Sequence, residues 1–263
     1  MLTTLKKIIP LSVKNTLKKK RTLFLHRGNT YLCPLCGYKA RDLSEIGMDY
    51  PVIKQKIIIG AGKRLGACYN CESTERERHI YLYLKEKVKL FTEKKYFKVL
   101  HIAPEKKLSA ILYNFGLGEY VCGDLIAAGY ENIYPEYVRK MDVLNIPYED
   151  NYFDLVICNH VLEHIPNDAD AMKELFRVLK AKGIAILQVP ISKIMEKTFE
   201  DFTVVTPQDR ARIFGQPDHV RIYGQDYPER LSATGFTVER INLSSEFRNM
   251  GLMEDEDIFV ARK

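Results

Sequence analysis

Long hydrophobic runs are missing from this sequence of 263 residues. No segment approaches the roughly 18 consecutive apolar residues of a membrane-spanning helix, and the first residues lack the continuous apolar centre of a secretory signal. We therefore expect a cytoplasmic protein with reduced cysteines. Hydrophobic residues make up 46% of the chain and charged residues 28%, which indicates one globular core with a small appendage.

Acidic residues are missing from residues 1–27, which carry eight basic ones. Subtracting these from the net charge of +6 leaves about −2 for the rest of the chain. The eight are Lys6, Lys7, Lys14, Lys18, Lys19, Lys20, Arg21 and Arg27. We interpret residues 1–29 as a basic amphipathic arm. One interpretation is that the arm contacts phosphates or the anionic inner face of a membrane. The other is that it is a solvated helix packed on its own protein.

Four of the six cysteines form two pairs, 33-CPLC-36 and 68-CYNC-71. A two-residue spacer lets both thiolates of a pair face one ion, and two pairs complete a tetrahedral sulfur site. We therefore predict a zinc-ribbon-like module over residues 30–72, with structural Zn²⁺ held by Cys33, Cys36, Cys68 and Cys71. Two disulfides or four unrelated core cysteines are the alternatives.

The segments around the second cysteine pair predict a hairpin and a helix. Residues 51–59, followed by Gly60 and Gly62, supply strand and turn material between the pairs. Residues 73–95 predict a connecting helix that Ser73 caps, with Glu77 near its positive end.

Residues 96–263 alternate between strand and helix patterns, which is typical of an α/β protein with a doubly wound sheet. Short apolar runs predict strands at 98–103, 119–122, 154–158, 184–189, 236–241 and 257–261. The last two can form a hairpin with one antiparallel member. Helices are expected at 105–112 and 168–183, the second closed by Gly183 in a left-handed conformation.

Ligands of such a sheet bind beyond the carboxyl ends of its strands. The candidate cofactor-binding residues at these ends are His101, Ala103, Pro104, Glu105, Asp124, Asp142, Val143, Asn159 and His160. Asp124 can accept from both ribose hydroxyls of a nucleoside, and Asp142 from an adenine amino group. Glycine, which usually shapes the first of these loops, is missing from 101-HIAPE-105.

The order of motifs resembles the class I S-adenosylmethionine-dependent methyltransferases of the type 11-like group. The resemblance is carried by 141-MDVLNIPYEDNYFDLVICNHVLEHIPNDADAMKELFRVLKAKGIAILQVP-190, most closely by 153-FDLVICNHVLEHI-165. It implies a seven-stranded Rossmann-like methyltransferase domain over residues 96–263 with S-adenosyl-L-methionine as cofactor. The stretches 101-HIAPE-105 and 214-FGQPDHVRIYGQDYPERL-231 resemble a subgroup with a preceding zinc module. Members of this subgroup are often associated with surface-glycan synthesis.

The glycine-free loop departs from the family pattern. We expect the methionine carboxylate of the cofactor to use free N–H groups at the following helix start, aided by Lys106 or Lys107. Its ammonium is expected to pair with Glu105. The alternative is a strand-to-helix corner that binds nothing.

Methyl transfer to a hydroxyl needs a base that removes its proton. We favour His219, oriented by Asp218, and take His160 as the second candidate. Arg221 is expected to bind an anionic group of the substrate, and the ring of Tyr223 to pack on a sugar. His164 and Glu163 recur in the family motif and are expected to fix the loop.

These features predict methyl transfer to oxygen of a glycan or small molecule, in polysaccharide biosynthesis. Two alternatives remain: a ribosomal RNA base methyltransferase that binds its substrate through the zinc module, and a non-catalytic interaction module with a degenerate cofactor loop. The body lacks an evident phosphate-binding stripe in its sequence, which argues against RNA. The oligomeric state has no signal in the sequence.

Overall fold

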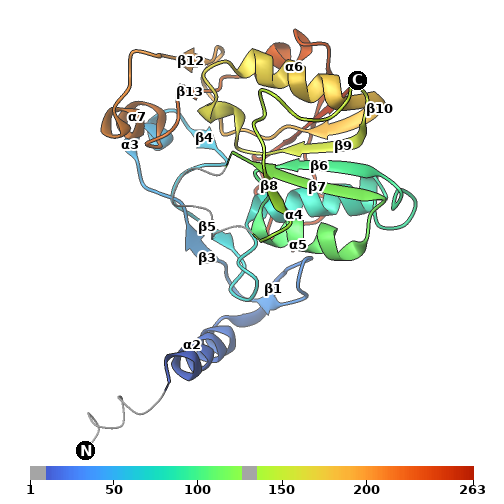
Figure 1. Cartoon of the computed structure of the whole chain (residues 1–263). Helices are drawn as coiled ribbons and strands as arrows, with labels where there is room; N and C mark the ends of the chain where they lie inside the picture. Colours follow the sequence, from blue (N-terminus) through green and yellow to red (C-terminus); the bar gives the residue numbers. More distant parts are fainter. Residues whose placement is uncertain (1–9, 126–134) are drawn as a thin grey trace, which may run out of the picture.

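The computed structural model describes residues 10–125 and 135–263. A seven-stranded sheet with the order β14-β15-β10-β9-β6-β7-β8 forms its centre (Figure 1). Strand β15 is antiparallel to β10 and β14, and the other pairs are parallel, which confirms the predicted sheet and final hairpin. The strands are β6 (Lys98–Ile102), β7 (Glu119–Asp124), β8 (Val138–Lys140), β9 (Phe153–Cys158), β10 (Leu179–Ile186), β14 (Thr237–Ile241) and β15 (Ile258–Arg262).

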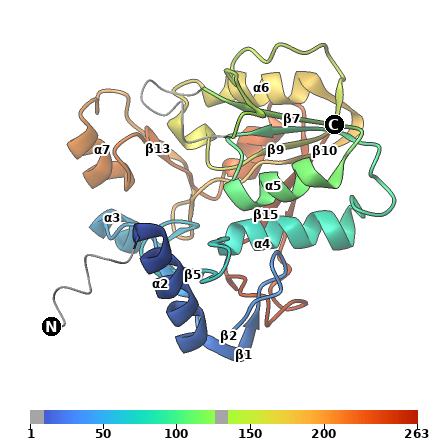
Figure 2. The same cartoon turned by 60° about the horizontal axis from the view of Figure 1, so that its bottom comes forward.

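Helices cover both faces of this sheet (Figures 1 and 2). Helices α6 (Asp168–Val178) and α8 (Tyr227–Ser232) lie on one face. Helix α4 (Glu75–Leu82), its π-helical extension (Tyr83–Lys87) and α5 (Lys106–Phe115) lie on the other. The central strands are therefore buried on both sides, as their continuous apolar runs predict.

The segment between the cysteine pairs differs from the prediction. Residues Pro51–Gln55 form a helix, α3, with proline in its first turn, where the missing N–H costs nothing. Val52 and Ile53 pack against Phe214, so this part of the apolar run reflects tertiary burial, and only Ile58–Ile59 at its end form a strand. The hairpin lies outside this run: β3 (Ser44–Ile46) pairs with β5 (Arg64–Ala67), and β1 (Arg27–Leu32) pairs with β2 (Lys39–Ala40).

A further strand of this segment joins the body. Strand β4 (Ile58–Ile59) pairs antiparallel with β11 (Ile191–Ser192), and Ser192 Oγ donates to the carbonyl oxygen of Lys56 at 2.6 Å. The remaining elements are β12 (Phe199–Glu200), β13 (Arg221–Ile222), α7 (Pro207–Phe214) and a 3₁₀ turn (Leu162–His164). The pairing of β4 with β11 brings the segment between the cysteine pairs to the carboxyl ends of the central strands, where Gly60 lies beside His160.

Two helix boundaries correct the prediction. Thr74, not Ser73, caps α4, because Thr74 and Glu77 form a reciprocal capping box. Helix α6 ends at Val178, and Gly183 lies within β10; Lys182 is the residue with a left-handed φ, of 63°. Strand pairing of β10 with β9 thus begins four residues before the predicted glycine cap.

Helix α2 (Leu11–Leu25) extends away from the sheet and has no buried residue (Figures 1 and 2). Most of its apolar side chains are exposed, and only Leu23 is half-buried against the cysteine-bearing loops. The part of the predicted arm before Pro10 lies outside the described residues. Among the helices of the described residues, none has the length and apolar character to cross a membrane.

Candidate active site and cysteine cluster

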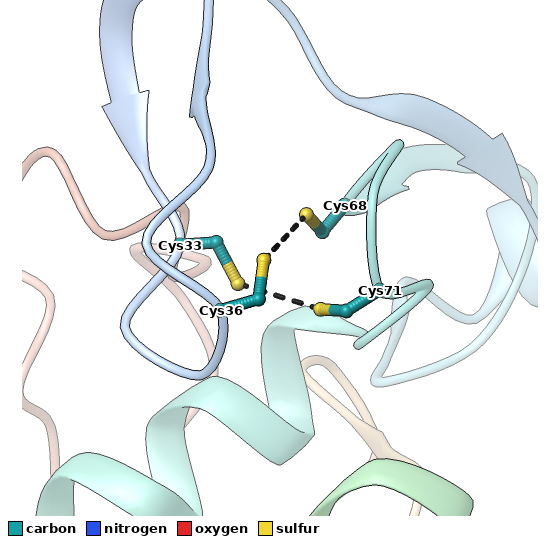
Figure 3. Close-up of side chains that lie close together, drawn as sticks. All are labelled: Cys33, Cys36, Cys68 and Cys71. Carbon is teal, nitrogen blue, oxygen red and sulfur yellow. Dashed lines mark hydrogen bonds between the residues drawn. The ribbon is translucent and has the colours of Figure 1, made fainter. Parts of the chain in front are cut away.

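The four predicted cysteine ligands converge from two loops (Figure 3). Cys33 Sγ lies 3.6 Å from Cys71 Sγ, and Cys36 Sγ lies 3.7 Å from Cys68 Sγ. These distances exclude disulfides, whose sulfurs are ~2.05 Å apart. They fit a tetrahedral ion, because Zn–S bonds of ~2.3 Å place sulfurs roughly 3.8 Å apart.

The loop backbones explain this convergence. After each pair the chain turns through a left-handed residue, Gly37 with φ of 72° and Glu72 with φ of 66°. The N–H groups of these residues donate to the carbonyl oxygens of Cys33 and Cys68, at 2.9 and 2.8 Å. Each turn points both sulfurs of its pair the same way. Ser73, predicted as a helix cap, instead places its hydroxyl 3.2 Å from the sulfur of Cys71.

Three predicted cofactor residues lie together at the ends of β6 and β9. Glu105 Oε2 lies 2.8 Å from His101 Nε2, and Glu105 Oε1 accepts from Asn159 Nδ2 at 3.1 Å. Burial raises the pKa of Glu105, but the hydrogen bond and charge of His101 together with the charge of Arg76 outweigh it and bring the pKa to about 2. Glu105 is therefore an ionised carboxylate that the fold holds in one position.

The start of α5 is not free to bind an anion. The backbone N–H groups of Lys107 and Leu108 donate to Glu77 Oε1 at 3.1 and 3.2 Å. Two of the N–H groups that were expected to hold the cofactor carboxylate are therefore already paired with a carboxylate from α4.

Two residues at these strand ends adopt a conformation that favours glycine. Ala103, after β6, has φ of 49°, and His160, after β9, has φ of 52°. Such conformations cost non-glycine residues about 1–2 kcal/mol and cluster at functional sites. Ala103 thus makes the sharp turn without the expected glycine, while Pro104 is buried beside it.

Several buried polar atoms near these strand ends have no hydrogen-bond partner among the described residues, and we call the space around them the crevice. They include Arg76 Nε, Asn159 Oδ1, His160 Nε2 and both carboxylate oxygens of Glu256. A Cβ on Gly60 would lie 3.4 Å from both Glu256 Oε1 and His160 Cε1, which places these two side chains around one point. Arg76 Nε is 3.5 Å from Glu105 Oε1.

Sequence reasoning missed Arg76 and Glu256. Both stand among other charged residues, in 75-ERER-78 and 254-EDED-257, and no local signal marks Glu256 as buried or Arg76 as half-buried. Glu256 is 2% exposed, and burial raises its pKa to about 7. It lines a cavity of ≈ 280 Å³ that Gln188, Lys193, Arg240 and Asp257 also line.

The other predicted cofactor residues lie along the same edge of the sheet. Asp124 ends β7, and its carbonyl oxygen accepts from Met141 N–H at 2.8 Å. Asp142 is exposed, and its Oδ1 accepts from Leu144 N–H at 2.9 Å, closing its own turn. The side chain of Val143 is part of the core, at 3% exposure.

The favoured base, His219, lies apart from the 280 Å³ cavity. Its ring is buried, which lowers its pKa to about 4, and Nε2 lies 4.0 Å from Glu163 Oε1. Asp218 does not orient it, since Asp218 Oδ2 contacts His164 Nδ1 at 3.3 Å. His219 instead belongs to a cluster of histidines around Glu163.

Arg221 and Tyr223 correct the predicted substrate contacts. Arg221 Nη1 donates to the carbonyl oxygens of Leu162 and Ile165 at 2.8 and 2.6 Å, and its side chain is fully buried. The hydroxyl of Tyr223, also fully buried, donates to Asp168 at 2.7 Å. Both side chains brace the loop after β9 and face protein, not solvent.

Comparison with known proteins agrees with this arrangement. Residues 107–187 match a family model described as a methyltransferase domain. The match begins just after the glycine-free loop and ends beyond β10. With the strand order, it confirms the predicted class I methyltransferase domain.

Two curated relatives and one solved structure illustrate the similarity. An uncharacterized protein of Methanocaldococcus jannaschii is 45% identical over 65 residues, which are 24% of this chain and 28% of that protein. A demethylmenaquinone methyltransferase of Lactobacillus johnsonii is 27% identical over 100 residues, 37% of this chain and 41% of that one. The chain thus spans less than half the length of either relative. A SAM-dependent methyltransferase structure from Archaeoglobus fulgidus aligns at 14% identity with a TM-score of 0.46, over 70% of this chain and 93% of that one.

Proposed function

We propose that this protein transfers the methyl group of S-adenosylmethionine to a hydroxyl of a small molecule or glycan. The observation that carries the proposal is the set of buried, unpartnered polar atoms at the ends of β6 and β9, within a methyltransferase domain. Each such atom costs about 1–3 kcal/mol unless a partner arrives, so their concentration in one crevice favours a ligand site.

The amino-acid part of the cofactor fits the Arg76 side of this crevice. The guanidinium of Arg76 replaces the occupied helix amides as partner of the methionine carboxylate, because charged hydrogen bonds to carboxylates are strong. The ammonium pairs with Glu105 and the free oxygen of Asn159. Asp124 remains the proposed partner of the ribose hydroxyls, and Asp142 that of the adenine amino group.

The acceptor side of the proposal rests on Glu256. Its ionised carboxylate takes the hydroxyl proton while the acceptor oxygen attacks the methyl carbon. The carbon–sulfur bond breaks, and its electron pair stays on sulfur in S-adenosylhomocysteine. A base with a pKa near 7 is half ionised at neutral pH, which suits this role, and the cavity that Glu256 lines is close to the ~300 Å³ of small-ligand sites.

Calorimetry with S-adenosylhomocysteine tests the proposal. Saturable heat with the full chain supports it, and no heat at high protein concentration would favour a non-catalytic interaction module. Transfer of labelled methyl to glycan hydroxyls would support a role in polysaccharide synthesis. Tight, salt-sensitive binding of ribosomal RNA would favour the RNA alternative instead.

The cysteine cluster fits a structural zinc ion. Four protein ligands leave no open position for a substrate, so the ion would hold the two loops and take no part in the transfer.

The exposed helix α2 fits an anionic membrane surface. Val13, Leu17 and Phe24 share one face because they are spaced by four and seven residues, and all three are exposed. Lysines flank this face, so the helix combines apolar and electrostatic attraction. The full chain should sediment with phosphatidylserine vesicles, and reversing the charges of Lys18 and Lys20 to Glu should leave it in the supernatant. Equal sedimentation of the charge-reversed chain would contradict this.

A further inference from the structure

A second cluster of ligand-type side chains surrounds Glu163, on the 3₁₀ turn after β9. Three histidine nitrogens approach its Oε1: His160 Nδ1 at 3.4 Å, His164 Nε2 at 4.0 Å and His219 Nε2 at 4.0 Å. Glu163 is 1% exposed, and neither of its oxygens has a hydrogen-bond partner among the described residues. A buried carboxylate in this condition requires a cation or a proton.

The positions of three of these groups suit a metal ion. One ligand atom each from Glu163, His164 and His219 lies within 4.8 Å of the other two. Donors on a tetrahedral ion with bonds of ~2.1 Å lie roughly 3.4 Å apart. The two contacts of Glu163 at 4.0 Å would therefore shorten by about 0.6 Å, and the two histidine nitrogens, which lie within 4.8 Å of each other, would approach by up to about 1.4 Å. A cavity of ≈ 10 Å³ borders Glu163 and His219, close to the ~10–15 Å³ that one water molecule needs.

The surroundings also orient the ligands as metal sites require. His164 Nδ1 lies 3.3 Å from Asp218 Oδ2, so a proton on Nδ1 leaves Nε2 as a free acceptor toward Glu163. A carboxylate behind a histidine is the usual outer partner of a ligating imidazole. The rings of His164 and His219 are perpendicular, with centroids 4.7 Å apart. His219 Nε2 is buried and has no hydrogen-bond partner in the described chain.

We propose that Glu163, His164 and His219 form a second metal site, for a divalent cation of the zinc class. Two imidazoles and one carboxylate suit Zn²⁺ and leave a fourth position open. His164, whose side chain is 29% exposed, gives the ion a path from solvent. This site is separate from the four cysteines and supplies the charge that the buried carboxylate lacks.

Metal analysis of the full chain, purified without a histidine tag, tests this proposal. Wild-type protein saturated with Zn²⁺ and then desalted should hold one equivalent more than Glu163→Gln and one more than His219→Leu. Zinc bound to the four cysteines is present in the wild type and in both variants, so it does not affect the difference in metal content between them. Glu229→Gln, at an exposed position on α8, is the matched control and should hold as much as the wild type. Equal metal content in all four proteins would overturn the proposal.

Cobalt substitution separates the two sites even if a variant fails to fold. Cobalt on thiolates gives an intense sulfur-to-metal charge-transfer band, whereas cobalt on imidazole and carboxylate gives only weaker ligand-field bands. The wild-type spectrum should contain both sets, and the second set should vanish in Glu163→Gln. A wild-type spectrum with thiolate bands alone, or without bound cobalt, would overturn the assignment.

Discussion

Glu77 holds the first turn of a neighbouring helix: its Oε1 accepts from the N–H of Leu108 at 3.2 Å. The same carboxylate completes the capping box of its own helix through Oε2, which accepts from Thr74 N–H at 3.0 Å. One side chain therefore satisfies the starts of both α4 and α5. Glu77 therefore neutralises the positive end of α5, and a cofactor carboxylate needs a different cation. Arg76, the residue before Glu77, is the cation that we propose for it.

Replacing Glu77 should destabilise the fold. Glu77→Ala leaves donors at two helix starts unpaired, so we expect the free energy of unfolding to fall by about 2 kcal/mol. Urea denaturation followed by circular dichroism measures this. Glu93→Ala, at an exposed position, should change stability by less than about 0.5 kcal/mol. An equal effect of both substitutions would show that the shared cap contributes little.

Removing the guanidinium of Arg76 should weaken cofactor binding. Loss of a charge-assisted contact of about 1.5–3 kcal/mol corresponds to roughly a 10- to 100-fold weaker affinity of Arg76→Leu for S-adenosylhomocysteine. Calorimetry provides the measurement. Arg212→Leu, on the exposed side of α7, should bind like the wild type. Unchanged affinity of Arg76→Leu would place the cofactor carboxylate elsewhere.

Glu256→Gln should separate turnover from binding. The amide cannot accept the acceptor proton, so kcat should fall by about 10²–10⁴ while affinity for S-adenosylhomocysteine stays the same. Wild-type turnover should rise as pH passes about 7, because the base must be ionised. Full turnover of Glu256→Gln with an unshifted pH profile would exclude this role.

The same carboxyl group should make stability depend on pH. Its folded pKa of about 7 exceeds the ordinary 4.5, so the folded state binds the proton more tightly. The stabilisation is complete below pH 4.5 and disappears as pH rises to about 7, a loss of up to roughly 3 kcal/mol. Urea titrations of the ligand-free protein should show Glu256→Gln losing less stability over this interval. Parallel curves would mean that Glu256 is solvated.

Breaking the cysteine cluster should release one metal ion and loosen its loops. Cys68→Ser should hold one equivalent of zinc less than the wild type and be cleaved faster by protease within residues 30–72. Cys122→Ala, in the core of the sheet, should retain its zinc. Equal zinc in Cys68→Ser and the wild type would exclude these sulfurs as ligands.

Features that depend on residues close together in the chain were predicted correctly from the sequence. The apolar run of β9 and the cysteine spacing each depend on neighbours in the chain, and both were found. The side chain of Arg221 is held by carbonyl groups more than fifty residues away in the chain. The sequence does not reveal these contacts, so the side chain was predicted to be available for a substrate. From the sequence, Arg76 and Glu256 look like solvated charges, but distant segments bury Glu256 and half-bury Arg76. Ala103 adopts a glycine-like conformation that no residue type reveals.

Gly60 lies between the two cysteine pairs, yet it forms a wall of the crevice beside His160 and Glu256. A gene fusion or truncation with its breakpoint at residue 96 would keep every strand of the sheet and discard this wall together with Arg76. The proposed site therefore draws on both halves of the chain, and engineering aimed at its acceptor preference would have to transplant residues from both at once.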